Sequence, residues 1–130
     1  MGGENPSALA VCSQIFSEAF DNFEILSPVN FATALTTIAK KARRMPKEEQ
    51  RQLVTGPAFR ELVAGAVEAA PFTKPRDLSN ILWALGTLKY SSDAVMKRFA
   101  AACATKVEDF STRDISNALW AFGCARDARP

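Results

Sequence analysis

The chain has 130 residues, 48% of them hydrophobic, which is enough to bury one core and fits a single small domain. Its formal charge of +2 is too small to indicate a polyanionic partner by itself, and no run of about 18 apolar residues predicts a membrane span. Histidine is absent, which excludes Ser–His and Cys–His nucleophiles and histidine metal sites, the commonest catalytic arrangements at neutral pH.

Three cysteines, Cys12, Cys103 and Cys124, occur without any CxxC spacing. This pattern predicts free, buried thiols in a reducing compartment rather than a disulfide framework or a zinc site. We therefore expect no metal ion, no cofactor and no catalytic residue. The first residues, MGGENPS, lack the features of a secretory signal and the Arg-rich start of a transit peptide, so any organelle address is missing here or encoded elsewhere.

Helical periodicity predicts an all-α fold in one helical-repeat domain over residues 1–130. The expected helices lie near 7–22, 28–42, 49–70, 75–89, 92–107 and 111–125. Proline or a capping serine marks three helix starts, at Ser27-Pro28, at Lys74-Pro75 and at Ser111 with Asp114. Period-2 alternation, which would indicate strands, is missing.

One phrase occurs twice, as RDLSNILWALG at 76–86 and as RDISNALWAFG at 113–123, an offset of 37 residues. A weaker copy begins at Pro28, where an offset of 47 places Phe31 on Leu78 and Ala39 on Gly86. Repetition with this period predicts an α-α solenoid of two-helix repeats of about 37 residues. The helices that carry the phrase are called A helices, and the helices between them B helices.

Two A helices have an apolar stripe at helical spacing, and we expect the stripe over residues 78–88 to face its partner B helix. The stripe consists of Leu78, Ile81, Leu82, Leu85 and Leu88 in one copy, and of Ile115, Ala118, Leu119, Phe122 and Ala125 in the next. In the B helices Leu62 and Phe99 lie 37 residues apart.

The predicted order is B, A, B, A, B, A, so we expect both ends of the array to expose apolar surface that a further repeat would cover. Three explanations fit: a segment of a longer array, a truncated gene product, or a protein that stacks end to end. Neighbouring repeats or other proteins could then bind through the end helices. No membrane partner is expected.

The opposite side of the A helices repeats a polar pattern: Arg76, Asn80, Trp83 and Thr87 correspond to Arg113, Asn117, Trp120 and Cys124. The weaker copy adds Val29, Thr33, Thr36 and Lys40 to this row. Amide and hydroxyl groups at a fixed pitch, bordered by basic residues, suit the successive bases of a single-stranded RNA. The predicted RNA-binding residues are Lys40, Arg43, Arg44, Arg76, Ser79, Asn80, Thr87, Arg113, Ser116 and Asn117.

Structural roles compete with binding at several of these positions. Trp83 and Trp120 are interpreted first as packing between repeats and second as stacking platforms for bases. Asn80 and Asn117 fit either a base edge or a hydrogen bond to the neighbouring helix, and Gly86 and Gly123 fit close helix contact. Residues 40–51 carry a net charge of +4, which indicates a solvated segment or a phosphate-binding edge.

The phrase PRDLSNILWALG at 75–86, with its near copy, resembles the octotricopeptide repeats and the related leucine-rich repeats of FAST kinase-like and RAP-domain proteins. The resemblance covers most of residues 7–127. It implies an α-solenoid that acts on transcripts or ribosomal RNA in the mitochondrial matrix or the chloroplast, in processing, stability or translation. It places base-reading positions near Ser79, Asn80 and Trp83, and near Ser116, Asn117 and Trp120.

The alternative function is a protein–protein interaction scaffold within a larger assembly, because solenoids of this period also bind peptides. Catalysis is not expected, since adjacent acidic pairs such as Glu108-Asp109 point apart on a helix and form no acid/base pair.

Overall fold

The computed structural model describes residues 8–21, 27–90 and 92–127, and every regular element in these ranges is helical. Seven α-helices and two short 3-10 helices are present within them. In chain order they are α1 (Ala8–Asp21), α2 (Pro28–Ala42), α3 (Lys47–Thr55), α4 (Pro57–Ala69), η2 (Ala70–Phe72), α5 (Pro75–Thr87), α6 (Asp93–Ala104), η3 (Val107–Asp109) and α7 (Thr112–Asp127). The all-α prediction is confirmed.

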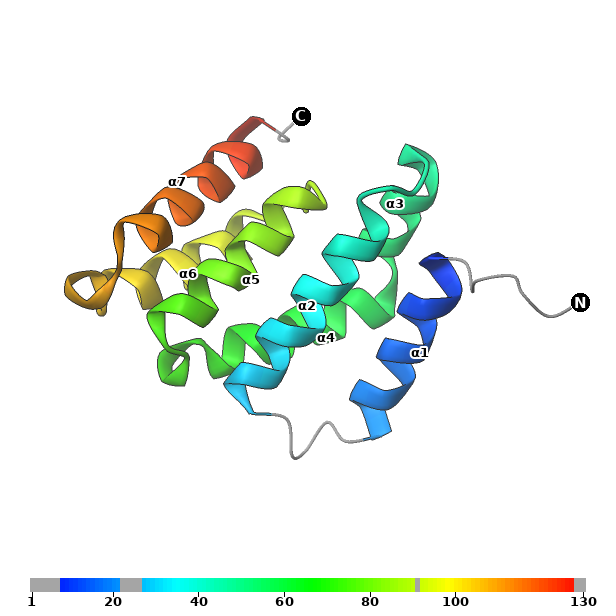
Figure 1. The fold of residues 1–130 in the computed structure, drawn as a ribbon, viewed down its shortest axis with the longest axis horizontal. Coiled ribbons are helices and arrows are strands. Elements are labelled where there is room, and N and C mark those ends of the chain that lie inside the picture. The colour runs from blue at the N-terminus through cyan, green and yellow to red at the C-terminus, as the bar shows by residue number, and fades with distance from the viewer. Residues whose placement is uncertain (1–7, 22–26, 91, 128–130) are drawn as a thin grey trace, which may run out of the picture.

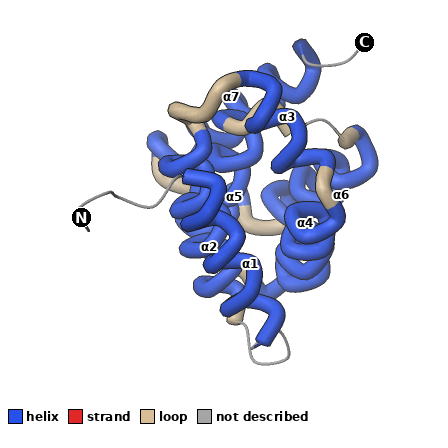
Figure 2. Tube along the Cα trace, turned by 90° about the vertical axis from the view of Figure 1, so that its right-hand side faces the viewer, coloured by secondary structure: helices blue, strands red, loops and turns tan. Residues whose placement is uncertain are grey.

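The three helices that carry the repeated phrase, α2, α5 and α7, lie side by side in chain order (Figure 1). Helix α1 lies on the side of α2 away from α5, and α4 and α6 lie behind the row. Figure 2 shows α2, α5 and α7 on one side of the molecule and α4 with α6 on the other. No helix of the described ranges therefore covers one face of α2, α5 and α7.

The apolar stripe of α5 forms the centre of the core, as predicted. Leu78, Ile81, Leu82 and Leu85 are completely buried, and Leu88 is 1% exposed. Leu62 of α4 and Phe99 of α6 are also completely buried. These two predicted B-helix residues therefore belong to the same core as the stripe of α5.

The predicted helix starts are confirmed. Pro28 and Pro75 are the first residues of α2 and α5, where the missing N–H of proline would have no helical partner. Before α7, the backbone N–H of Asp114 donates to the Ser111 hydroxyl oxygen, and the N–H of Ser111 donates to the Asp114 carboxylate, each at 3.1 Å. This reciprocal pair is a capping box.

The single helix predicted over 49–70 is wrong, because the structure has α3 and α4 there. The break falls at Gly56, whose extended backbone (φ −72°, ψ 154°) ends α3 immediately before Pro57. Proline disfavours helical geometry at the residue that precedes it, and its ring nitrogen has no proton to donate to the preceding turn. The Gly-Pro pair therefore ends one helix and begins the next.

The stripe of α7 differs from that of α5. Ala118 is 6% exposed, but Ile115 is 39% exposed and Leu119 is 66% exposed. No helix among the described residues covers this side of α7. The predicted apolar exposure is thus found at the C-terminal end, whereas the described side chains of α1 include no exposed large hydrophobic residue.

Lys106 makes backbone contacts distant in sequence. Its ammonium donates to the carbonyl oxygens of Ala70 at 3.2 Å, Pro71 at 2.8 Å and Thr73 at 2.6 Å. These three bonds use all the donors of a lysine ammonium. They join the residues just before α7 to those just before α5.

Candidate functional site

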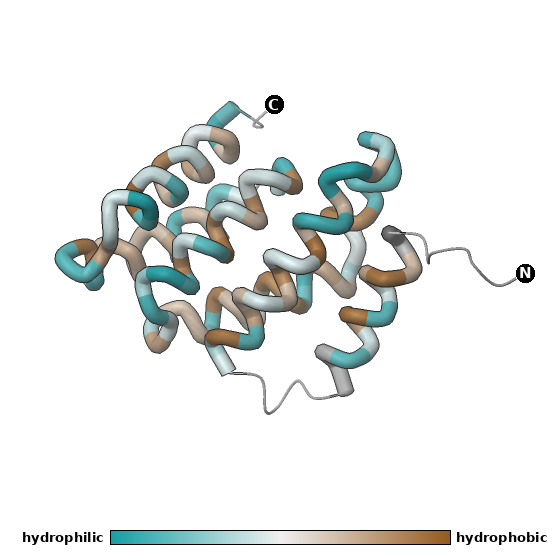
Figure 3. The backbone as a smooth tube through the Cα atoms, in the orientation of Figure 1, coloured by the Kyte–Doolittle hydropathy of each residue, from teal (hydrophilic) through white to brown (hydrophobic). Residues whose placement is uncertain are grey.

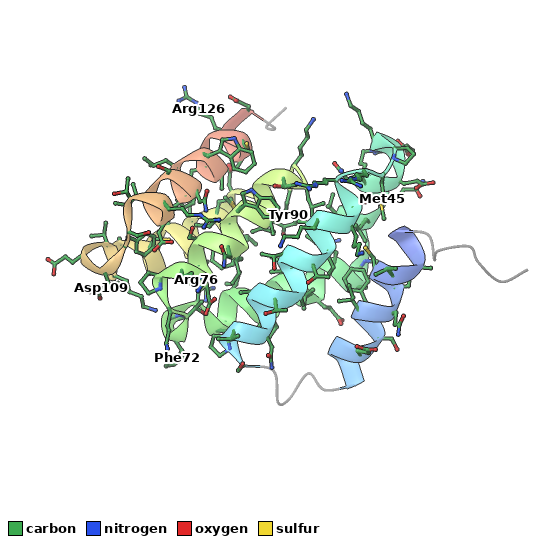
Figure 4. All side chains as sticks on the ribbon, viewed as in Figure 1. Met45, Phe72, Arg76, Tyr90, Asp109 and Arg126 are labelled. Atoms are coloured by element: carbon green, nitrogen blue, oxygen red, sulfur yellow. The ribbon has the colours of Figure 1, made fainter. Side chains whose placement is uncertain are left out.

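The uncovered face of α2, α5 and α7 contains a hollow of about 610 Å³ near the beginnings of α5 and α7. It is lined by Thr36, Lys40, Arg76, Asn80, Trp83, Ser111, Arg113, Asp114 and Asn117. All three phrase-bearing helices contribute to it, because the side-by-side packing places equivalent positions next to one another. Arg76 lies near the beginning of α5 (Figure 4).

Two further hollows continue this one. The second, also of about 610 Å³, is lined by Arg43, Trp83, Gly86, Thr87, Lys89, Trp120, Cys124 and Asp127. The third, of about 290 Å³, is lined by Thr37, Lys40, Lys41, Arg43 and Arg44 along the hydrophilic C-terminal end of α2 (Figure 3). Because Trp83, Lys40 and Arg43 are each shared by two hollows, the three form one depression, which we call the basic groove.

Positive charge prevails in the first hollow. The hollow is lined by three cationic side chains, Lys40, Arg76 and Arg113, and by one carboxylate, Asp114. An oxygen of this carboxylate already accepts the N–H of Ser111. Within the described part of the chain these three cations form no ion pair. By contrast, Arg51 pairs with Glu48 at 2.7 Å outside the groove. The groove cations are therefore available to an anionic ligand.

Most of the predicted RNA-binding residues lie together. The groove is lined by Lys40, Arg43, Arg44, Arg76, Asn80, Thr87, Arg113 and Asn117. Ser79 does not belong to it, because its side chain is buried at 1% exposure and its hydroxyl has no hydrogen-bond partner within the described structure. Ser116 is exposed on α7 but lines none of the three hollows.

The tryptophans have both packing and lining roles. A Cβ placed on Gly86 would lie 2.8 Å from Cζ3 of Trp120 and 3.2 Å from Cα of Ala121, so glycine is needed for this close contact of α5 with α7. The predicted inter-repeat packing is confirmed for Trp120, although its side chain is also 47% exposed. Gly123 has no atom within 4 Å of such a Cβ, so close contact is absent there.

Lys89 is a groove residue that the sequence did not indicate. It follows the C-cap residue of α5 with φ 54°, a left-handed conformation that usually belongs to glycine or asparagine, and it lines the second hollow. Asp114 and Asp127 were also missed; both are carboxylates within the groove. The only sequence signal for Asp114 was its capping position.

The cysteines are poor nucleophiles. Burial raises the pKa of the Cys103 thiol to about 11, despite the opposing effect of Lys106, and burial also raises the pKa of Cys12. The pKa of Cys124 is raised by burial and then by Asp127. Thiolate, the reactive form, is therefore scarce at neutral pH.

Alkylation with iodoacetamide at about pH 8 is expected to modify Cys124 first, Cys103 slowly and Cys12 last. Cys12 is completely buried, whereas the other two are half-buried. The rate at Cys103 should rise as the pH approaches about 11, its pKa, because the thiolate fraction increases. Peptide mass spectrometry over a pH series measures this order. Fast modification of Cys103 at neutral pH would contradict it.

No protein-family model matches the chain, and no solved structure matches it. Among the described residues, no group of three or more cysteine and acidic side chains could hold a metal ion. None of the helices described here has the length and apolar content that crossing a bilayer requires.

Proposed function

We propose that this protein binds single-stranded RNA along the basic groove, as an α-α solenoid with two-helix repeats of about 37 residues. The observation that carries this proposal is the first hollow. There Arg76 and Asn80 of α5 lie with Arg113 and Asn117 of α7, the same residues one repeat apart. A ligand with a regularly repeated structure would meet the same chemistry at each repeat.

The groove offers the contacts that an unpaired strand needs. Arginine and lysine bind phosphate oxygens, and an asparagine amide can both donate to and accept from a base edge. Trp83 is half-buried and lines two hollows, where its indole ring could stack on a base. Base edges and faces are accessible only when the strand is unpaired, which favours single-stranded over double-stranded RNA.

The resemblance to octotricopeptide and FAST kinase-like repeats supports the same proposal. It adds an organellar setting, the mitochondrial matrix or the chloroplast, and a role in RNA processing, stability or translation. The exposed Ile115 and Leu119 on α7, which do not line the groove, favour a second function, protein–protein interaction, at a different surface.

The test is the affinity for a short mixed-sequence single-stranded RNA, measured by fluorescence anisotropy over a salt series. With Lys40, Arg76 and Arg113 each contacting phosphate, the logarithm of the association constant should fall with the logarithm of salt concentration with a slope of about −2. Arg76→Gln with Arg113→Gln should weaken binding about tenfold and make the slope shallower by about 1.4.

The matched control is Arg60→Gln with Lys97→Gln, which removes the same charge from exposed positions of α4 and α6, outside the groove. We expect it to leave affinity and slope nearly unchanged. An RNA duplex of the same composition should bind more weakly than the single strand. Equal losses in the two double variants would mean that the groove is not the binding site.

A further inference from the structure

The face that α5 presents to α7 is repeated on α7 and lies open there. Leu78 and Leu82 are completely buried, whereas their counterparts one repeat later, Ile115 and Leu119, are 39% and 66% exposed. Ser79 is 1% exposed, and its counterpart Ser116 is exposed. The same residue types therefore form a covered interface on α5 and an open surface on α7.

Gly86 and Gly123 differ in whether a tryptophan packs on them. Gly86 is covered by Trp120 and Ala121 of α7, with a Cβ-to-Cζ3 separation of only 2.8 Å if a Cβ is added. Gly123, its counterpart, meets nothing within 4 Å. The socket that receives a tryptophan on α5 is thus present on α7 and empty within the described structure.

The turn that binds the Lys106 ammonium is also repeated, but its partner is not. The 3-10 turns η2 and η3 are equivalent, since Thr73 N–H donates to Ala70 O and Phe110 N–H donates to Val107 O, each at 3.1 Å. The carbonyl groups at η2 hold the Lys106 ammonium. No described ammonium reaches η3, whose Glu108 and Asp109 are exposed. Asp109 lies at one end of the molecule (Figure 4).

We propose that the open face of α7, together with η3, docks a helical hairpin of defined chemistry. The second helix of this hairpin presents a Trp-Ala pair to Gly123, and a lysine before that helix binds the η3 carbonyl groups. The hairpin formed by α6 and α7 has this chemistry and covers the equivalent face of α5. The interface between α5 and the α6–α7 hairpin therefore indicates which side chains a partner of the open α7 face must carry.

A second copy of this chain does not provide the occupant. The chain has two tryptophans, and Trp120 already fills the Gly86 socket while Trp83 is half-buried against the core. The A helix nearest the N-terminus, α2, carries Thr36 and Thr37 at the position of Trp83 and Ala84. A threonine is too small to fill a site shaped for an indole ring.

The experiment extends the protein by a copy of its own residues 91–127, placed directly after Asp127 in place of the last three residues. Urea unfolding is measured for the natural and the extended chain, each with and without Gly123→Ala, and for the natural chain with Gly86→Ala. In the natural chain, Gly123→Ala should raise the unfolding midpoint or leave it unchanged, because alanine favours helix and has free space there.

In the extended chain Gly123→Ala should lower the midpoint, as Gly86→Ala does in the natural chain, because the appended tryptophan then occupies the socket. A midpoint that rises in both chains overturns the proposal, and so does trypsin removal of the appended residues as an unfolded tail. If the natural protein sediments as a dimer that Leu119→Asp dissociates, a second copy is the occupant and the proposal is wrong. None of these measurements involves RNA, so their outcome is independent of the proposed RNA binding.

Discussion

Leu82→Ala is expected to lower the free energy of unfolding by about 2–5 kcal/mol, whereas Leu119→Ala should change it by less than about 0.5 kcal/mol. The two leucines occupy the same position of the repeated phrase, 37 residues apart. Leu82 is completely buried, so its truncation removes packed atoms and leaves a cavity. Leu119 is 66% exposed, and alanine has at least as high a helix propensity.

Urea unfolding followed by far-UV circular dichroism measures both variants. The comparison controls for sequence context, because the neighbours Ser, Asn, Trp and Ala are shared between the two copies. A loss at Leu119 as large as that at Leu82 would show that another surface covers α7 in solution.

Lys106→Met is expected to lower the free energy of unfolding by about 1.5–3 kcal/mol. Methionine keeps most of the aliphatic stem, but the carbonyl oxygens of Ala70, Pro71 and Thr73 lose a charged donor. Lys97→Met on α6 is the control, since Lys97 is exposed and makes no hydrogen bond or ion pair with the described residues. Thermal unfolding of the two variants measures the difference, and equal stability would mean that the Lys106 contacts contribute nothing net.

The features that the sequence predicted correctly are local or periodic. The leucine stripe of α5, the prolines at the beginnings of α2 and α5, and the Ser111–Asp114 cap each depend on residues a few positions apart. The break at Gly56-Pro57 was equally local, and the Gly-Pro pair was a sufficient signal for it. One helix over 49–70 is excluded because Gly56 adopts an extended backbone before Pro57, although the residues on both sides of the pair are helical.

The errors in the candidate site arise from contacts distant in sequence. Ser79 and Ser116 are serines at the same position of the two copies of the repeated phrase. Ser79 is buried and Ser116 is exposed, because burial depends on whether another helix packs against that face. The left-handed Lys89 could not be predicted, since lysine has no preference for that conformation. Residues of α2, α5 and α7 line the same hollow because the shared helical register determines which side chains face the same side.

Two contacts hold α5 and α7 together at opposite ends. Near the helix beginnings, Lys106 links the segment before α7 to the segment before α5 through backbone carbonyl groups, and near the end of α5, Trp120 packs on Gly86. The spacing between Asn80 and Asn117 is therefore set when the protein folds, before any ligand arrives. For the RNA binding proposed above, a strand whose repeat matches that spacing would meet a preorganised pair of amides, so the protein would lose little conformational entropy on binding, whereas a strand of different pitch would have to deform.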